Sequence, residues 1–159
     1  IKDGQDIYAK TKILGEVIDD THLTIRTSII GPCIKKDGQG LFHWFMNQNE
    51  VINGYKKAIW SGVTTLQLAK GIDFFISNDI KGLYHLTNNS SISKYELLKL
   101  FKKYINKDII IKSVDGKESN KSFVDTIDLL DDNLPNYENM IKDMVKDILK
   151  NEDIYRHYL

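Results

Sequence analysis

The sequence predicts an α/β protein, because segments with helical periodicity alternate with short apolar segments that are typical of strands. The first pair shows this most clearly. Residues 7–18 place apolar side chains at helical spacing, and residues 23–30 are rich in β-branched residues and end in Gly31-Pro32. A continuous apolar run of this kind suits a strand that is buried on both faces of a parallel sheet.

Composition sets the class of protein. The chain has 159 residues, enough for one domain with a core, and Lys plus Arg equals Asp plus Glu at 22 each. Without a net charge, we expect neither nucleic acid nor an anionic membrane as a partner. No long uncharged apolar run predicts a membrane span. The single cysteine, Cys33, excludes an internal disulfide and fits a reducing compartment, so we expect a cytoplasmic protein.

The helix expected at residues 7–18 carries a Tyr and a Lys four residues apart, Tyr8 and Lys12. Residues i and i+4 share one face of a helix, so the two side chains should lie together. An ammonium beside a phenol favours the phenolate, which makes a tyrosine usable as a general acid or base. The expected core face lies opposite and consists of Ile13, Leu14, Val17 and Ile18.

The same spacing recurs at Tyr95 and Lys99, so spacing alone is weak support for a site. There the apolar stripe leaves Tyr95 and Lys99 on the far, solvated face of the helix. We therefore interpret the second pair as a surface feature.

The strand expected at residues 23–30 ends beside Thr27 and Ser28. Ligands of open α/β sheets bind beyond the carboxyl ends of the strands. Thr27 and Ser28 are therefore candidates for ligand contact. The alternative is a turn that ends the strand and contacts no ligand.

The remaining elements follow in alternation. A polar loop spans residues 35–40, and Asn53-Gly54 is a turn signal. Thr64 or Thr65 should cap one helix, and Ser93 should cap the next. No metal-ligand spacing of His, Cys or acidic residues occurs. Helices are expected at 41–46, 66–77, 93–106 and after Pro135, with strands at 52–60, 82–87 and 108–113. The last helix should bury Met140, Ile141, Met144, Val145, Ile148 and Leu149.

The order of these motifs resembles the extended short-chain dehydrogenase/reductase family. Tyr-x-x-x-Lys and Leu14-Gly15-Glu16 precede the first strand, and Gly82-Leu83-Tyr84-His85-Leu86 and Leu134-Pro135-Asn136-Tyr137 follow later. Gly62-Val63-Thr64 resembles a family turn but lacks its Pro. The likeness is greatest to the branch of dTDP-4-dehydrorhamnose reductases and related nucleotide-sugar reductases and epimerases. It covers most of residues 7–150.

The resemblance implies the C-terminal half of a Rossmann-like fold with a small substrate-binding subdomain. Residues 1–32 would supply the catalytic helix and the following Rossmann strand. Residues 33–159 would be mainly substrate-binding, with interleaved Rossmann elements, so that 1–159 form a single piece. No Gly-rich dinucleotide-binding turn occurs in the sequence. We therefore expect the N-terminal, dinucleotide-binding half to be missing.

The resemblance also assigns roles to residues. Tyr8 would be the proton donor to the keto oxygen, and Lys12 would hold the nicotinamide ribose. Thr27, Ser28 and Ile30 would complete the cofactor contacts of this chain, for NADP or NAD. Trp60, Ser61 and Gly62 would lie beside a nucleotide diphosphate sugar.

The implied activity is the reduction of a 4-keto sugar in cell-surface polysaccharide biosynthesis. We expect the fragment itself to be inactive, and a homodimer is a possible partner arrangement. Within the family, epimerase or dehydratase is the nearest alternative. Two readings from other classes stay open: a regulator that binds cofactor without catalysis, and a free-standing interaction domain in which Tyr8 and Lys12 are surface residues.

Overall fold

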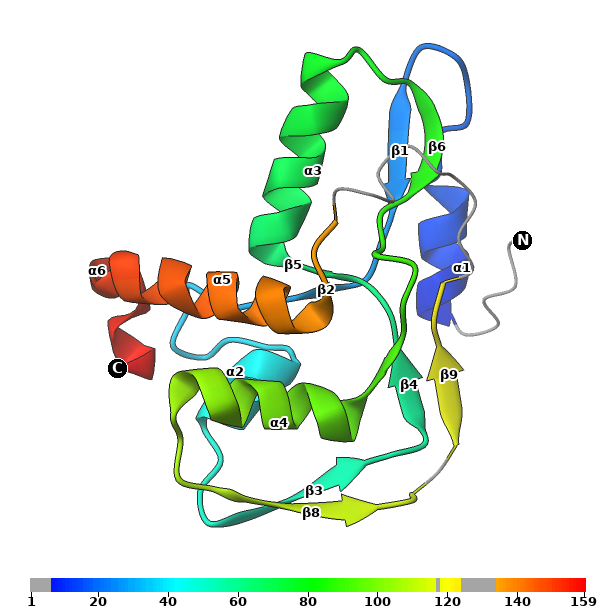
Figure 1. Cartoon of the computed structure of the whole chain (residues 1–159). Coiled ribbons are helices and arrows are strands. Elements are labelled where there is room, and N and C mark those ends of the chain that lie inside the picture. The colour runs from blue at the N-terminus through cyan, green and yellow to red at the C-terminus, as the bar shows by residue number, and fades with distance from the viewer. Residues whose placement is uncertain (1–6, 117, 124–133) are drawn as a thin grey trace.

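The computed structural model describes residues 7–116, 118–123 and 134–159, and it confirms the α/β prediction (Figure 1). The helices are α1 (Ile7–Leu14), α2 (Leu41–Met46), α3 (Thr65–Ser77), α4 (Lys94–Ile105), α5 (Tyr137–Lys150) and α6 (Glu152–Tyr155), followed by a 3-10 turn at Arg156–Tyr158. The strands are β1 (Leu23–Arg26), β2 (Ile29–Ile30), β3 (Val51–Tyr55), β4 (Ala58–Trp60), β5 (Val63–Thr64), β6 (Gly82–His85), β7 (Ile92–Ser93), β8 (Ile110–Val114) and β9 (Ser119–Lys121).

The strands pair mainly in parallel and at long range. β1 pairs with β6, β2 with β5, and β3 with β8, all in parallel. β4 lies between β7, which is antiparallel to it, and β9, which is parallel. Helix α3 runs beside β1 and β6, while α4 and α5 lie next to one another at the other end of the chain's fold (Figure 1).

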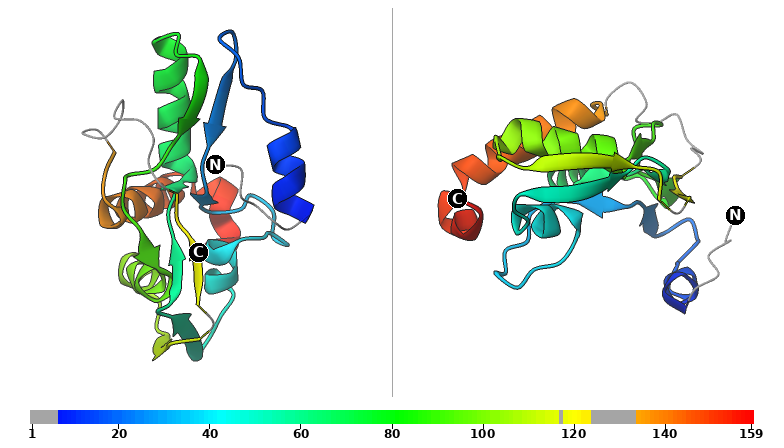
Figure 2. Two further views of the ribbon diagram at one scale, coloured as in Figure 1. Left: turned by 90° about the vertical axis from the view of Figure 1, so that its right-hand side faces the viewer. Right: turned by 90° about the horizontal axis from the view of Figure 1, so that it is seen from below.

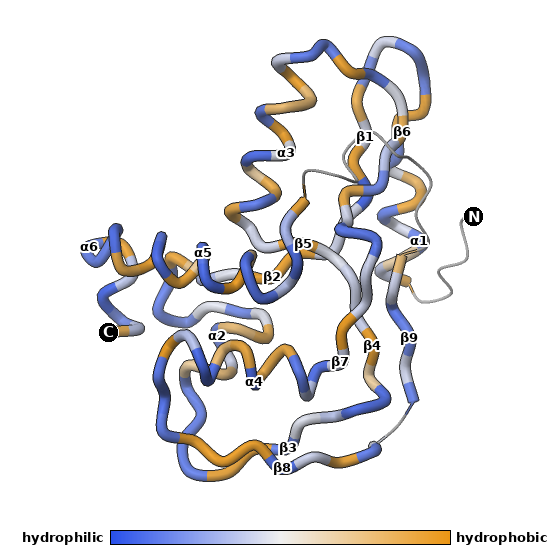
Figure 3. Tube along the Cα trace, viewed as in Figure 1, coloured by the Kyte–Doolittle hydropathy of each residue, from blue (hydrophilic) through white to orange (hydrophobic). Residues whose placement is uncertain are grey.

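Helix α5 joins the two apolar clusters of the core. Its first turn contributes Tyr137 and Met140 to a cluster with Phe75 of α3 and Leu86. Its later turns belong to a larger cluster with α2 and α4. Figure 3 shows the alternation of apolar and polar positions along this helix. The predicted stripe is confirmed except at Leu149, which is 51% exposed.

The helix caps agree with the sequence. The Thr64 hydroxyl accepts a hydrogen bond from the backbone N–H of Gln67 at 3.2 Å, and that of Ser93 accepts from Glu96 N–H at 3.1 Å. Helix α4 ends at Asn106, whose left-handed backbone (φ 57°) closes it. None of the helices in the described part of the chain has the length and apolarity that crossing a bilayer requires.

Two strand predictions need correction. The single strand expected at 23–30 divides at Thr27 and Ser28, because β1 pairs with β6 while β2 pairs with β5. Asn53-Gly54 is not a turn; it lies inside β3, and the chain reverses at Lys56-Lys57. A Cβ on Gly54 would lie 2.6 Å from Tyr95 Cδ2, so the glycine allows close packing instead. The sequence also shows a loose family match at 120–126 and an acidic, turn-like segment at 128–132; residues 124–126 and 128–132 lie outside the described residues.

The expected core face of the first helix is wrong. Helix α1 ends at Leu14, because Gly15 follows and takes up the final turn, and none of its residues is buried. Leu14 is 85% exposed, Ile18 is 55% exposed and Val17 is also exposed. Both views of Figure 2 show α1 standing off from the other helices. Its apolar stripe therefore faces away from the core formed by the described residues.

Candidate functional site

The Tyr8–Lys12 pair lies on α1 as the spacing predicts. The Lys12 Nζ atom is 5.5 Å from the centroid of the Tyr8 ring, a cation–π distance. The phenol is 72% exposed. No carboxylate of the described residues forms an ion pair with Lys12, so its ammonium has donors to offer to a ligand hydroxyl.

The connection from β1 to β2 holds the next two candidates. The Thr27 hydroxyl donates to the backbone oxygen of Leu86 at 2.8 Å, just beyond the end of β6. The Ser28 hydroxyl accepts from the indole N–H of Trp60 at 2.7 Å. Ile30 is buried at 7% exposure and is part of the core. Thr27 and Ser28 therefore lie at the carboxyl ends of parallel strands, where α/β folds bind ligands.

The structure brings Ser28 and the predicted substrate residues together. Besides the Ser28–Trp60 contact, the backbone oxygen of Ser28 accepts from Val63 N–H at 3.0 Å. Gly62 has a φ of 154°, and a Cβ there would lie 2.0 Å from the Ser28 oxygen. Only glycine fits this approach of the two segments.

Ser61 and Trp60 are held by the protein itself. Ser61 is 1% exposed, and its hydroxyl accepts from the Phe123 backbone N–H at 2.6 Å. The Trp60 ring lies 5.8 Å from the Tyr137 ring, centroid to centroid. The hydroxyl of Ser61 and the indole N–H of Trp60 are therefore both engaged inside the chain. The remaining surface of Trp60, which is half-buried, is the part that could face a substrate.

Two residues beside this cluster were not predicted as site residues. Tyr137 donates its phenol to the backbone oxygen of Ser90 at 2.7 Å, and burial raises the pKa of Tyr137 to about 12. Thr87 is 4% exposed, and its hydroxyl has no partner among the described residues. Thr87 directly follows the apolar end of the β6 segment. Because ligands of open α/β sheets bind beyond the carboxyl ends of the strands, this position in the sequence could have identified Thr87 as a candidate for ligand contact.

His85 has partners within the chain. It stands opposite Arg26 in the β1–β6 register, and its Nε2 lies 3.4 Å from Arg26 Nη1. Its ring also contacts Phe123 at 5.5 Å between centroids. His43 is buried and contacts the Tyr158 hydroxyl at 2.7 Å through Nδ1. Among the described residues, no group of His, Cys, Asp and Glu has the arrangement of a metal site.

Solved structures of nucleotide-sugar enzymes share the fold of this chain. A dTDP-4-dehydrorhamnose reductase from Bacillus anthracis in complex with NADP matches with a TM-score of 0.68 and 21% identity, over 88% of this chain and 52% of that one. One from Clostridium acetobutylicum matches with a TM-score of 0.62 and 16% identity, over 79% and 48%. A UDP-N-acetylglucosamine 4-epimerase from Methanobrevibacter ruminantium, in complex with UDP-N-acetylmuramic acid, matches with a TM-score of 0.59 and 17% identity, over 91% and 50%.

These likenesses establish the fold. The chain has the Rossmann-like α/β fold of extended short-chain dehydrogenase/reductase structures and spans about half the length of the proteins it matches. No family model matches the chain, and no curated protein is significantly similar to it in sequence.

Proposed function

We propose that this chain is the C-terminal, substrate-side part of an NAD(P)-dependent nucleotide-sugar reductase that reduces a 4-keto sugar. The observation that carries the proposal is the placement of the Tyr8–Lys12 pair on the helix that precedes β1 of this fold. Solved enzymes of the same fold are named as reductases and epimerases of nucleotide sugars. In this proposal the complete protein acts in the cytoplasm, in the synthesis of cell-surface polysaccharide. The proposal is compatible with a homodimer of that protein.

The hydrogen-bonding groups of Lys12, Thr27 and Ser28 are of the kind that binds a nicotinamide dinucleotide. Lys12 presents an ammonium without a carboxylate partner among the described residues, which suits the hydroxyls of a ribose. Thr27 and Ser28 lie at the carboxyl ends of the parallel strands. A bound reduced dinucleotide supplies the hydride for the carbonyl carbon of the sugar.

Tyr8 performs the acid half of the reaction. Its phenol donates a proton to the carbonyl oxygen as the carbon–oxygen double bond becomes single, so the ketone becomes an alcohol. Lys12 holds the ribose and favours the phenolate that Tyr8 leaves behind. Trp60, Ser61 and Gly62 line the substrate side, with Gly62 allowing the close approach to Ser28 that sets their position.

The test uses the complete gene product that contains this chain, with NADPH and dTDP-4-dehydrorhamnose. We expect net oxidation of NADPH and transfer of deuterium from labelled NADPH to the sugar carbon. Tyr8→Phe should lower kcat by about 10²–10⁴-fold, the range for losing a general acid. Tyr95→Phe, in the second pair of the same spacing, is the matched control and should leave kcat unchanged.

Other outcomes separate the alternatives. Interconversion of sugar isomers without net consumption of NADPH would identify an epimerase of the same fold. A silent Tyr8→Phe variant would contradict catalysis at this helix and favour a cofactor-binding regulator or an interaction domain. The isolated chain of 159 residues should give no turnover in a single-turnover assay, and turnover there would contradict the fragment part of the proposal.

A further inference from the structure

Helix α1 carries the Tyr8–Lys12 pair and has no buried residue. A helix of 8 residues is marginal in water when nothing packs on it. Its placement therefore depends on how the segment that follows it, residues 15–22, is attached to β1. We call this segment the α1–β1 connection.

One ion pair holds the connection to the end of β1. The Arg26 Nε donates to Glu16 Oε1 at 2.6 Å, and Arg26 Nη2 donates to Glu16 Oε2 at 2.7 Å. A bidentate guanidinium–carboxylate contact fixes orientation as well as distance. The two side chains are only 16% and 12% exposed, whereas every other ion pair found among the described residues exposes each partner by at least 39%.

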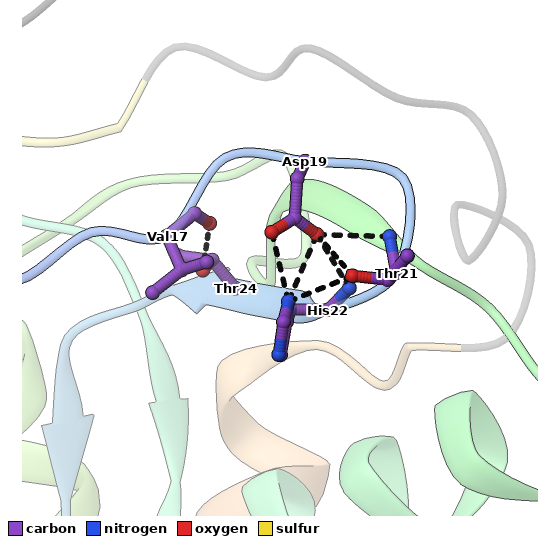
Figure 4. Close-up of polar contacts among 5 residues, drawn as sticks. All are labelled: Val17, Asp19, Thr21, His22 and Thr24. Atoms are coloured by element: carbon purple, nitrogen blue, oxygen red, sulfur yellow. Dashed lines mark hydrogen bonds and ion pairs between the residues drawn. The ribbon is translucent and has the colours of Figure 1, made fainter.

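Two further contacts hold the same connection (Figure 4). The Thr24 hydroxyl donates to the backbone oxygen of Val17 at 2.5 Å. Asp19 Oδ1 accepts from the backbone N–H groups of Thr21 at 2.8 Å and His22 at 2.7 Å, an Asx-type turn. These hydrogen bonds hold the pKa of the Asp19 carboxyl well below its usual range, led by the contact from Thr21. The connection is therefore held at its beginning, middle and end.

Arg26 ties this connection to the candidate site. It is the last residue of β1, and it stands opposite His85, the last residue of β6. The next residue, Thr27, binds the Leu86 backbone. The guanidinium thus links the exit of α1 to the carboxyl ends of both parallel strands, where the candidate cofactor residues lie.

We propose that Glu16 and Arg26 are positioning residues, whose largely buried bidentate pair fixes the position of helix α1 and the Tyr8–Lys12 pair relative to the carboxyl ends of β1 and β6. The catalytic part of this inference rests on the proposed function. The positional part does not, so the two can be tested separately.

The positional test measures the distance between α1 and α4 in this chain. Spin labels replace two exposed lysines, Lys10→Cys on α1 and Lys102→Cys on α4, in a Cys33→Ser background. We expect a narrow distance distribution in the labelled chain and a broader one in Glu16→Gln. Arg26→Lys should broaden the distribution less, because lysine keeps the positive charge and loses only the bidentate geometry of the guanidinium. The matched control is Glu96→Gln, which breaks the exposed Glu96–Lys99 pair and should leave the distribution narrow.

The catalytic test measures kcat and KM of the complete enzyme. Glu16→Gln should lower kcat by about 10²-fold, the loss expected when a catalytic group is misplaced by about 1 Å, with KM for the sugar nucleotide unchanged. Glu96→Gln should change neither. A general loss of folded protein would also lower Vmax at unchanged KM, so kcat is expressed per active site, and the thermal midpoint of each variant is measured alongside.

A variant without a charge change guards against misfolding, because Glu16→Gln removes a carboxylate that binds the largely buried guanidinium of Arg26. Thr24→Val removes the contact to Val17 and keeps a β-branched side chain in β1. It should broaden the same distribution. Unchanged distributions in Glu16→Gln and Thr24→Val would overturn the inference. So would an unchanged kcat in Glu16→Gln while Tyr8→Phe is inactive. If Tyr8→Phe is itself silent, the proposed function fails, and the distance measurement still decides the positional inference.

Discussion

Helices α1 and α4 each carry a tyrosine followed four residues later by a lysine. The lysine nitrogen lies 5.5 Å from the ring centroid in α1 and 5.3 Å in α4. Local geometry therefore does not separate the two pairs, because the helix repeat imposes it on both.

Their surroundings do separate them. In α4, Lys99 forms an ion pair with Glu96 at 3.0 Å, and the hydrogen bond that Lys99 donates to that carboxylate raises the pKa of Lys99. Tyr95 covers Gly54 of β3. In α1, by contrast, Tyr8 is exposed and Lys12 has no carboxylate partner among the described residues. A candidate site is therefore better identified by which polar groups are left available than by spacing.

The largest expected contrast concerns the far faces of the two helices. Phe101 of α4 is fully buried, 5.1 Å from Phe42 and 5.6 Å from Phe45 between ring centroids. Phe101→Ala should lower the free energy of unfolding of this chain by about 3–5 kcal/mol in urea titrations. Leu14→Ala on α1 should change it by less than about 0.5 kcal/mol. A large loss from Leu14→Ala would show that α1 is buried in solution and would break the comparison.

The next contrast concerns the lysines. In the complete enzyme, Lys12→Met should lower kcat by about 10²-fold, because the ammonium that favours the phenolate is lost. Lys99→Met should leave kcat unchanged, since that ammonium is already paired with Glu96. Steady-state kinetics of the two variants measures the contrast directly, and equal effects would contradict it.

Much of the fold could be predicted from local sequence. Helices α4 and α5 follow from caps at Ser93 and Asn136 and from apolar residues at helical spacing. The face of α1 could not be predicted, because periodicity identifies an apolar face but not what covers it. β5, β7 and β9, and the division of the 23–30 strand into β1 and β2, could not be predicted, because these short strands have only two or three residues and depend on distant partners.

In the candidate site, too, local contacts could be predicted from the sequence and long-range contacts could not. The Tyr8–Lys12 contact follows from helix geometry within one turn. The contact of Ser28 with Trp60 joins residues 32 apart in sequence, and the ion pair of Glu16 with Arg26 depends on a chain reversal between them. Thr87 stands out only once its burial and its unpartnered hydroxyl are known. Long-range contacts were the part that sequence reasoning could not supply.

A smaller contrast concerns the side-chain hydroxyls that bind backbone at the two helices. Ser93 caps α4 by accepting from Glu96 N–H, so Ser93→Ala should cost about 1 kcal/mol of unfolding free energy. Thr11 of α1 donates instead to the Tyr8 backbone oxygen, within an exposed helix. Thr11→Ala should change the free energy by less than about 0.5 kcal/mol. Equal losses in denaturant titrations would show that α1 is as stable as α4.

The last prediction concerns the pH dependence of stability that the buried phenol of Tyr137 should cause. Burial raises the pKa of Tyr137 from an ordinary value of 10.0 to about 12, against a weaker opposing hydrogen bond from the Gly62 backbone. The unfolded chain therefore loses this proton near pH 10 while the folded chain keeps it, so the stability present below pH 10 is lost as the pH rises toward 12. Tyr137→Phe removes this contribution, and the stability difference between wild type and variant should shrink over that range. A difference that stays constant between pH 10 and pH 12 for Tyr137→Phe would contradict the burial of that phenol.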